Sequence, residues 1–271
     1  MLTLLLLFAL KVTTPGEMAC VGSVRNMTAP LDLYIAGVEQ EGMLAFATQG
    51  HIVYLNGPRI SGLKPGMVQR VIRPEGKVHD PATRTKLGFY YRDIGTVQIE
   101  TVTQEGAVAR VISSCQAMLK GDLVVPDAPK QSVEYNGNLS NDLTVLPSNG
   151  LASTILLGKD DLRELAAGQF CFIGLGVNDG IKPGDRFIVF RPYPGFNSQD
   201  MTSNGEGVNS SYSRMSNRAY RSKVNELLHK RTLAPQILGD IIVVEPGDGI
   251  SAGKIVNSLF VMHPGDFVVK K

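Results

Sequence analysis

The sequence predicts a mostly β protein made of two tandem small β-barrel modules, with one amphipathic helix inserted in the second. Three features favour this fold. The chain has 29 glycines among 271 residues, it contains many short runs rich in Val, Ile and Tyr, and part of it is repeated. Its composition of 43% hydrophobic and 19% charged residues is typical of a globular protein.

The internal repeat is the most informative of these features. Residues 50–74 align without a gap with residues 168–192, and the identical pairs include Gly62/Gly180, Lys64/Lys182, Pro65/Pro183, Gly66/Gly184 and Arg73/Arg191. Residues 94–126 align in the same way with residues 238–270, with Gly95/Gly239, Ser114/Ser258, Gly121/Gly265 and Asp122/Asp266 in common. The offset grows by 26 residues, from 118 to 144, which places one insertion between Pro192 and Leu238.

Each copy contains five short runs with the composition of β-strands. They are residues 51–55, 67–73, 95–102, 107–113 and 122–126 in the first copy, and residues 169–173, 185–191, 239–245, 251–258 and 266–271 in the second. Apolar and polar residues alternate in 95–102 and 186–190, which predicts strands with one buried face. Because closing a small sheet removes its exposed edges, each copy is expected to form a closed or nearly closed barrel.

The composition along the chain predicts four segments. They are a signal or export segment at residues 1–30, a first barrel module at 31–126, a polar linker at 127–150, and a second module at 151–271 with the insertion at 193–237. Residues 2–10 form an apolar run that is too short to span a membrane and fits the hydrophobic region of a secretory signal peptide. If this segment is retained, we expect a buried first strand instead.

The chain has three cysteines, Cys20, Cys115 and Cys171, and no two are close enough in sequence to form a CxxC motif. The odd number argues against a full disulfide framework. Cys115 and Cys171 lie in apolar runs, so both are predicted to be buried core thiols. Cys20 follows Ala19, as in a bacterial lipidation site, but Glu17 takes a position that such a site gives to an apolar residue. Lipid attachment at Cys20 is left open.

The Gly-rich stretch at residues 174–185, GLGVNDGIKPGD, raises the question of phosphate binding. It has neither the GxGxxG spacing of a dinucleotide-binding loop nor the GKS or GKT of a P-loop. We therefore interpret it as a turn in which Gly180 and Gly184 adopt positive φ angles. The same structural role is predicted for the other turn residues that the copies share, namely Gly62, Pro65, Gly66, Pro183, Gly121, Asp122, Gly265 and Asp266.

No pattern typical of a catalytic, cofactor-binding or metal-binding site occurs in the sequence. The four histidines lack HxxxH and HExxH spacing. No GxSxG elbow surrounds Ser114 or Ser258, so their hydroxyls are expected to bond to the backbone. We therefore predict no catalytic residue, no cofactor and no metal, and a protein that is not an enzyme.

The insertion carries the candidate recognition residues. After a Ser- and Asn-rich stretch, residues 216–231 have the spacing of an amphipathic helix with basic side chains. The candidate partner-binding residues are Arg214, Arg218, Tyr220, Arg221 and Lys223. The alternative is that the apolar face of this helix packs on the second barrel. A nucleic-acid partner is not expected, because the net charge is only +2 and aromatic residues are few.

The succession of motifs VYL, GLKPG, VIRP, HDPATRTKLG, IGTVQIETV, ARVISS and GDLVVP in residues 53–126 resembles a bacterial envelope module. It is similar to the β-rich region that follows the LysM domain in some exported bacterial proteins and to the C-terminal part of flagellar assembly protein T. More remotely, it resembles the tandem β-barrels of rod-shape-determining protein C. The resemblance implies a scaffold without catalysis. No LysM motif occurs in the chain, so no peptidoglycan-binding residue is carried over.

The sequence therefore predicts an exported, periplasmic or envelope-associated protein that binds or scaffolds without catalysis. The expected partner is an envelope protein or peptidoglycan, with proximity to a membrane and self-association as further expectations. Residues 79–86 and the insertion are the loops expected to carry recognition. Two alternatives remain open: a subunit of a ring or filament, and an enzyme or small-ligand binder with its site between the barrels.

Overall fold

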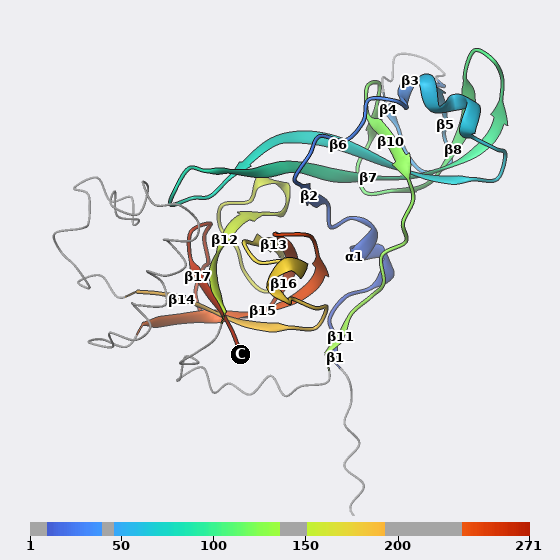
Figure 1. Cartoon of the computed structure of the whole chain (residues 1–271). Coiled ribbons are helices and arrows are strands. Elements are labelled where there is room, and N and C mark those ends of the chain that lie inside the picture. Colours follow the sequence, from blue (N-terminus) through green and yellow to red (C-terminus); the bar gives the residue numbers. More distant parts are fainter. Residues whose placement is uncertain (1–9, 40–45, 136–150, 193–234) are drawn as a thin grey trace, which may run out of the picture. The chain divides into compact units, whose positions relative to one another are not determined.

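The computed structural model describes residues 10–39, 46–135, 151–192 and 235–271, which form two compact units (Figure 1). Unit 1 takes the described parts of Met1–Thr14, Lys77–Gly88 and Ser132–Lys271. Unit 2 takes the described parts of Pro15–Gly76 and Phe89–Gln131. Each unit contains one closed barrel, and both are described separately below.

The first barrel has six antiparallel strands. They are β3 (Tyr34–Val38), β5 (Ile52–Asn56), β6 (Val68–His79), β7 (Lys86–Val102), β8 (Ala107–Ser114) and β10 (Leu123–Pro126). Their spatial order is β7-β6-β10-β3-β5-β8, and the pairing of β7 with β8 closes the barrel. A seventh strand, β2 (Ser23–Arg25), pairs with residues 89–91 of β7, ahead of the part of β7 that contacts β8.

The second barrel is built in the same way (Figure 1). Its strands are β12 (Ala152–Gly158), β13 (Phe170–Ile173), β14 (Arg186–Arg191), β15 (Gln236–Pro246), β16 (Ser251–Ser258) and β17 (Phe267–Lys270). They close in the order β12-β13-β16-β15-β14-β17. Replacing β3, β5, β6, β7, β8 and β10 by these six strands in turn reproduces the order of the first barrel. The predicted tandem repeat of two β-barrels is thus confirmed.

Shorter elements join these strands. Strand β1 (Leu10–Lys11) pairs with β11 (Glu134–Tyr135), and β4 (Phe46–Ala47) pairs with β9 (Met118–Leu119). The one α-helix in the described residues is α1 (Pro15–Ala19), and there are three 3₁₀ turns, η1 (Pro58–Gly62), η2 (Lys159–Asp161) and η3 (Val177–Asp179). The predicted helix of the insertion lies outside the described residues.

Strand alternation fills the core of the first barrel. In β5, Val53 and Leu55 are fully buried while Tyr54 between them is exposed. Val97 and Ile99 of β7 join them in the same core. This is the pattern of a strand with one face toward the barrel interior, as the sequence predicted for residues 95–102.

Strand β14 departs from this pattern, because all of its residues from 186 to 190 are buried. Phe187 and Val189 lie in the barrel core, whereas Ile188 and Phe190 belong to a second apolar cluster that includes Ala82. Ala82 lies at the tip of the β6–β7 hairpin, and this tip, residues 77–88, belongs to unit 1. The prediction of one exposed face for residues 186–190 is therefore wrong, since a segment more than 100 residues away in the chain covers that face.

The glycines shared by the two copies serve as backbone turns. Gly180 and Gly184 have φ angles of 77° and 88°, as predicted, and Gly66 matches Gly184 with 87°. The stretch GLGVNDGIKPGD contains η3, which the Asp179 carboxylate caps by accepting a hydrogen bond of 3.0 Å from the Gly176 N–H. Gly121 and Gly265 also have matching φ angles, 93° and 101°.

Residues outside the two barrels are also ordered. Met18, Val21 and Ala29, which fall within the segment assigned to export, are buried in unit 2. Residues 127–135 of the assigned linker likewise contribute hydrogen bonds and strand β11, while residues 136–150 lie outside the described part of the chain.

Candidate functional site

An arginine–aspartate pair recurs in both barrels. Arg73 at β6 donates two hydrogen bonds, of 2.7 and 2.8 Å, to the carboxylate of Asp122, which immediately precedes β10. Arg191 makes the same contact with Asp266, at 2.7 Å for both bonds. Each carboxylate also accepts a backbone N–H three residues before it, from Leu119 in one copy and His263 in the other. Each aspartate thus ties the turn before its own strand to the neighbouring strand of the same barrel.

The carboxylates of these pairs keep the two arginines protonated. The hydrogen bond to Asp122 is the largest influence on the pKa of Arg73 and raises it, against the opposing effect of burial. Asp266 raises the pKa of Arg191 in the same way. Both arginines keep their proton and are engaged by their carboxylate, so we assign these pairs to the framework of the barrels.

Arg73 and Asp122 match Arg191 and Asp266 in the repeat, but the sequence alone did not indicate that the two residues of each copy pair. One feature of the sequence could have indicated the pairing: the arginine and the aspartate both recur in the second copy, as expected for two residues that form an ion pair. Ser114 and Ser258 behave as predicted. Their hydroxyls donate to the carbonyls of Gln116 and Phe260 at 2.7 and 2.8 Å.

The cysteines correct one prediction and confirm another. Cys20 and Cys115 form a disulfide, so the prediction of a buried free thiol at Cys115 is wrong. The bond arises because the segment after α1 passes beside the turn that follows β8, 95 residues further along the chain. Cys171 is a fully buried free thiol, as predicted, and burial raises its pKa to about 12.

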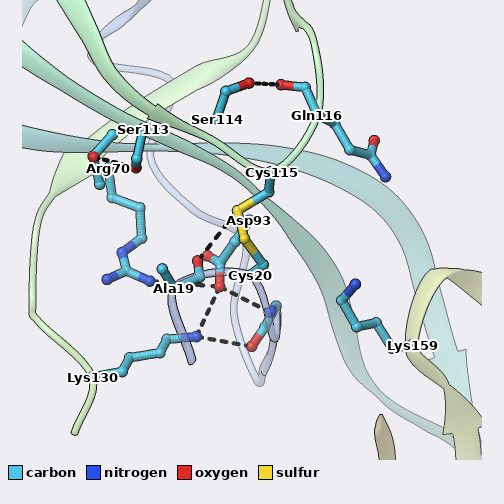
Figure 2. The surroundings of a disulfide bond; sticks show 12 residues. Ala19, Cys20, Arg70, Asp93, Ser113, Ser114, Cys115, Gln116, Lys130 and Lys159 are labelled. Carbon is cyan, nitrogen blue, oxygen red and sulfur yellow. Dashed lines mark hydrogen bonds and ion pairs between the residues drawn. A yellow bond between two sulfur atoms is a disulfide. The ribbon is translucent and has the colours of Figure 1, made fainter. Parts of the chain in front are cut away.

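A buried cluster of charged side chains lies beside this disulfide and forms the candidate site. Asp93 of β7 is its centre, with only 2% of its side chain exposed. Its carboxylate accepts a hydrogen bond of 2.8 Å from the Gly22 N–H and another of 2.8 Å from the Lys130 ammonium group. Figure 2 shows the Lys130 side chain extended toward Asp93 next to the two sulfur atoms.

Arg70 extends the cluster on its other side. Its guanidinium lies 3.5 Å from the carboxylate of Asp93 and donates two hydrogen bonds to Asp127, at 2.8 and 3.0 Å. Lys130 also donates to the carbonyl of Gly22, at 3.1 Å. The cluster thus holds two cations and two anions, with no net charge. It is drawn from four parts of unit 2: the segment after α1, β6, β7 and the residues that follow β10.

The segment from α1 to β2, residues 15–25, closes over the cluster, and we call it the strap. It carries Met18 and Val21, whose side chains are completely buried, and its Gly22 contacts both Asp93 and Lys130. Cys20 attaches it covalently to Cys115. The charged groups are therefore covered by a segment that a disulfide attaches to the barrel.

The loop at residues 79–86, which was expected to carry recognition, is packed within unit 1. Asp80, Ala82 and Thr83 are buried there. The Asp80 carboxylate accepts hydrogen bonds of 2.9 Å from the N–H groups of Ala82 and Thr83, which fixes the loop as a tight turn. His79, Arg84, Thr85 and Lys86 of the same loop are exposed, so the expectation that it carries recognition stays a prediction.

The predicted partner-binding residues, Arg214, Arg218, Tyr220, Arg221 and Lys223, lie outside the described residues. Within the described ranges, no group of three or more His, Cys, Asp or Glu side chains is arranged to hold a metal ion. None of the helices in those ranges has the length and apolar character needed to cross a membrane. The sequence matches no protein-family model and no curated protein closely enough to indicate a relative.

Proposed function

We propose that this protein is an exported, non-enzymatic component of a bacterial cell envelope that binds or scaffolds other envelope material. The observation that carries the proposal is that the charged residues shared by the two copies form ion pairs within each barrel. Arg73 bonds to Asp122 and Arg191 bonds to Asp266, each pair within its own barrel. Polar groups used in this way maintain a rigid framework, which is what a scaffold requires.

The disulfide supports the proposed location. Disulfides form and persist in oxidising compartments such as the periplasm, whereas thiols of cytosolic proteins are kept reduced. The Cys20–Cys115 bond closes a loop that contains most of the first barrel. A leader that is removed on export would have to end upstream of Cys20, and lipid attachment at Cys20 would compete with the disulfide for the same sulfur.

The proposed partner is an envelope protein or peptidoglycan. Recognition is assigned first to the insertion at residues 193–237, because it carries the candidate basic residues Arg214, Arg218, Arg221 and Lys223. The insertion follows Arg191, whose backbone pairs with Gln236 where the chain returns to the barrel. It is therefore carried at the end of the β14–β15 ladder, as recognition loops on rigid scaffolds commonly are.

Fractionation combined with thiol trapping tests the location. We expect the protein in the periplasmic or envelope fraction, with Cys20 and Cys115 inaccessible to a maleimide until a reductant is added. A cytosolic protein in which both cysteines are labelled without reduction would contradict the proposal.

Cross-linking followed by affinity purification from envelope fractions tests recognition. Three chains are compared: the intact protein, one lacking residues 193–234 of the insertion so that β15 is kept, and one in which Arg214, Arg218, Arg221 and Lys223 are replaced by Gln. We expect the deletion to remove the cross-linked partner and the neutralised chain to weaken its recovery. An unchanged partner set in both variants would overturn the assignment of recognition to the insertion.

A further inference from the structure

We infer that the strap, residues 15–25, is a redox-controlled cover of the first barrel. While the Cys20–Cys115 bond is intact, the strap encloses Asp93 and pairs with the edge of β7 at residues 89–91. When the bond is reduced, the strap detaches and the barrel beneath it stays folded. This inference goes beyond the proposed envelope function and concerns a change of state within the protein.

The second barrel closes with the same strand order, and the described residues contain no segment equivalent to the strap on it. Cys115 corresponds to Leu259 in the repeat, and both N–H groups donate at 2.8 Å to the equivalent carbonyls, those of Ile94 and Leu238. The turn is therefore built alike in both copies. In the second copy, Leu259 and Phe260 are 55% and 51% exposed, and no disulfide is attached there. The strap is thus an addition to the first barrel and is not needed to form its turn.

The non-covalent forces on the strap oppose one another. Burial of Met18 and Val21 holds it down, as do the hydrogen bonds that Gly22 makes with Asp93 and Lys130. In contrast, closing it removes water from the charged groups of Asp93, Lys130 and Arg70, whose side chains are only 2%, 10% and 8% exposed. Desolvation of buried ion pairs commonly offsets much of their mutual attraction. Because these contributions counteract each other, the covalent bond decides which state is populated.

The hydrogen-bonded contact of the strap with the barrel is also short. Strand β2 has three residues, and it pairs with Phe89, Tyr90 and Tyr91 at the edge of β7. An isolated strand of this length has little stability of its own. Its release would leave the backbone N–H and C=O groups of that edge unpaired, which is the type of surface that accepts another extended chain.

The switching step is a thiol–disulfide exchange with a dithiol reductant. A thiolate of the dithiol attacks one sulfur of the Cys20–Cys115 bond, forms a mixed disulfide, and the displaced cysteine thiolate takes up a proton. The second thiol of the reagent then displaces the other cysteine. Two electrons and two protons pass to the protein, which gains two thiols, while the dithiol becomes a disulfide.

Hydrogen exchange and lysine acylation, both read by mass spectrometry, test the inference on the full chain. The oxidised protein is compared with the protein reduced by dithiothreitol and with a Cys20→Ser/Cys115→Ser variant. In the last two samples, we expect exchange at residues 22–25 and 89–91 to become about tenfold faster or more, with a parallel rise in acylation of Lys130 by a succinimidyl ester. Peptides from β8 and β13 should exchange at unchanged rates, and reoxidation should restore the closed pattern.

A Cys171→Ala chain is the matched control. It keeps the disulfide and should close and open in the same way, which separates the strap from the third thiol. Two results would overturn the inference. In the first, exchange and acylation stay unchanged after both cysteines have been reduced and alkylated, which would show that non-covalent contacts alone keep the strap in place. Exchange that rises equally in β8 would show that the disulfide supports the whole barrel.

Discussion

Arg73 and Asp122 are 49 residues apart in the chain, yet they form a doubly hydrogen-bonded ion pair whose counterpart, Arg191 with Asp266, has the same geometry in the second barrel. The Asp122 side chain is 3% exposed and that of Arg73 is 24% exposed, whereas Arg191 is 38% exposed. The pair in the first barrel is therefore less well hydrated than its equivalent in the second.

Replacing Asp122 by Asn should destabilise the first barrel by about 2 to 4 kcal/mol, because Arg73 would remain partly buried without its counter-charge. Asp266→Asn should have a smaller effect, since water reaches Arg191 more freely. Hydrogen exchange of β6–β8 and of β14–β16 measures each barrel separately. Glu100→Gln is the control: its ion pair with Arg110 is 38% and 49% exposed and should contribute less than about 1 kcal/mol. Equal effects of all three changes would contradict the argument.

Gly95 and Gly239 should tolerate no side chain. Their φ angles are 152° and 154°, and a Cβ atom at either position would collide with a backbone carbonyl oxygen, that of Ser113 or Asn257. We expect Gly95→Ala and Gly239→Ala to cost about 3 kcal/mol or more each in their own barrel. Gly62→Ala, where nothing lies within 4 Å, should change stability by less than about 0.5 kcal/mol. The free energies follow from denaturant titrations monitored by exchange.

Cys171 should make the second barrel sensitive to alkali. Its pKa is about 12 in the folded protein against a reference value of 9.0, so between these pH values the unfolded chain loses a proton that the folded one keeps. Stability should therefore be unaffected well below pH 9 and fall above it, by up to about 1.4 kcal/mol per pH unit. The difference between the wild type and Cys171→Ala isolates this effect from other titrations. A difference that is independent of pH would argue against a buried thiol.

Asp93 and Lys130 should be strongly coupled. Asp93→Asn and Lys130→Met each leave a buried charge with one partner fewer, so each single change should be costly. The double variant should cost less than the sum of the single changes, by about 1 to 3 kcal/mol. The measurement is a double-mutant cycle on the oxidised protein, followed by exchange of β7. Strict additivity would mean that the hydrogen bond of 2.8 Å between them contributes nothing to stability.

The repeat allowed both barrels to be predicted because the residues that it preserves serve local needs. Gly66 and Gly184 adopt turn conformations that other residues rarely take, and Val53 or Ile99 face a core by simple alternation. The second copy confirmed each of these patterns within the sequence itself.

The features that escaped prediction depend on where distant segments meet. Nothing in the neighbourhood of Cys20 indicates that it bonds to Cys115, because that depends on the path of the strap. The same holds for Asp93, whose partners come from Gly22, Arg70 and Lys130. Burial of Ile188 and Phe190 on the outer face of β14 was missed because the covering residue, Ala82, lies in the other copy of the repeat.

This last contact means that the second copy of the repeat is covered in part by a loop from the first. Residues 77–88 arise from the first copy of the repeat, but they complete unit 1, which otherwise contains the second. A chain cut in the polar segment at residues 136–150 would leave Ile188, Phe190 and Val269 of the second half without the Ala82 loop. The second barrel expressed alone would therefore expose an apolar strip on the outer face of β14 that the intact chain covers.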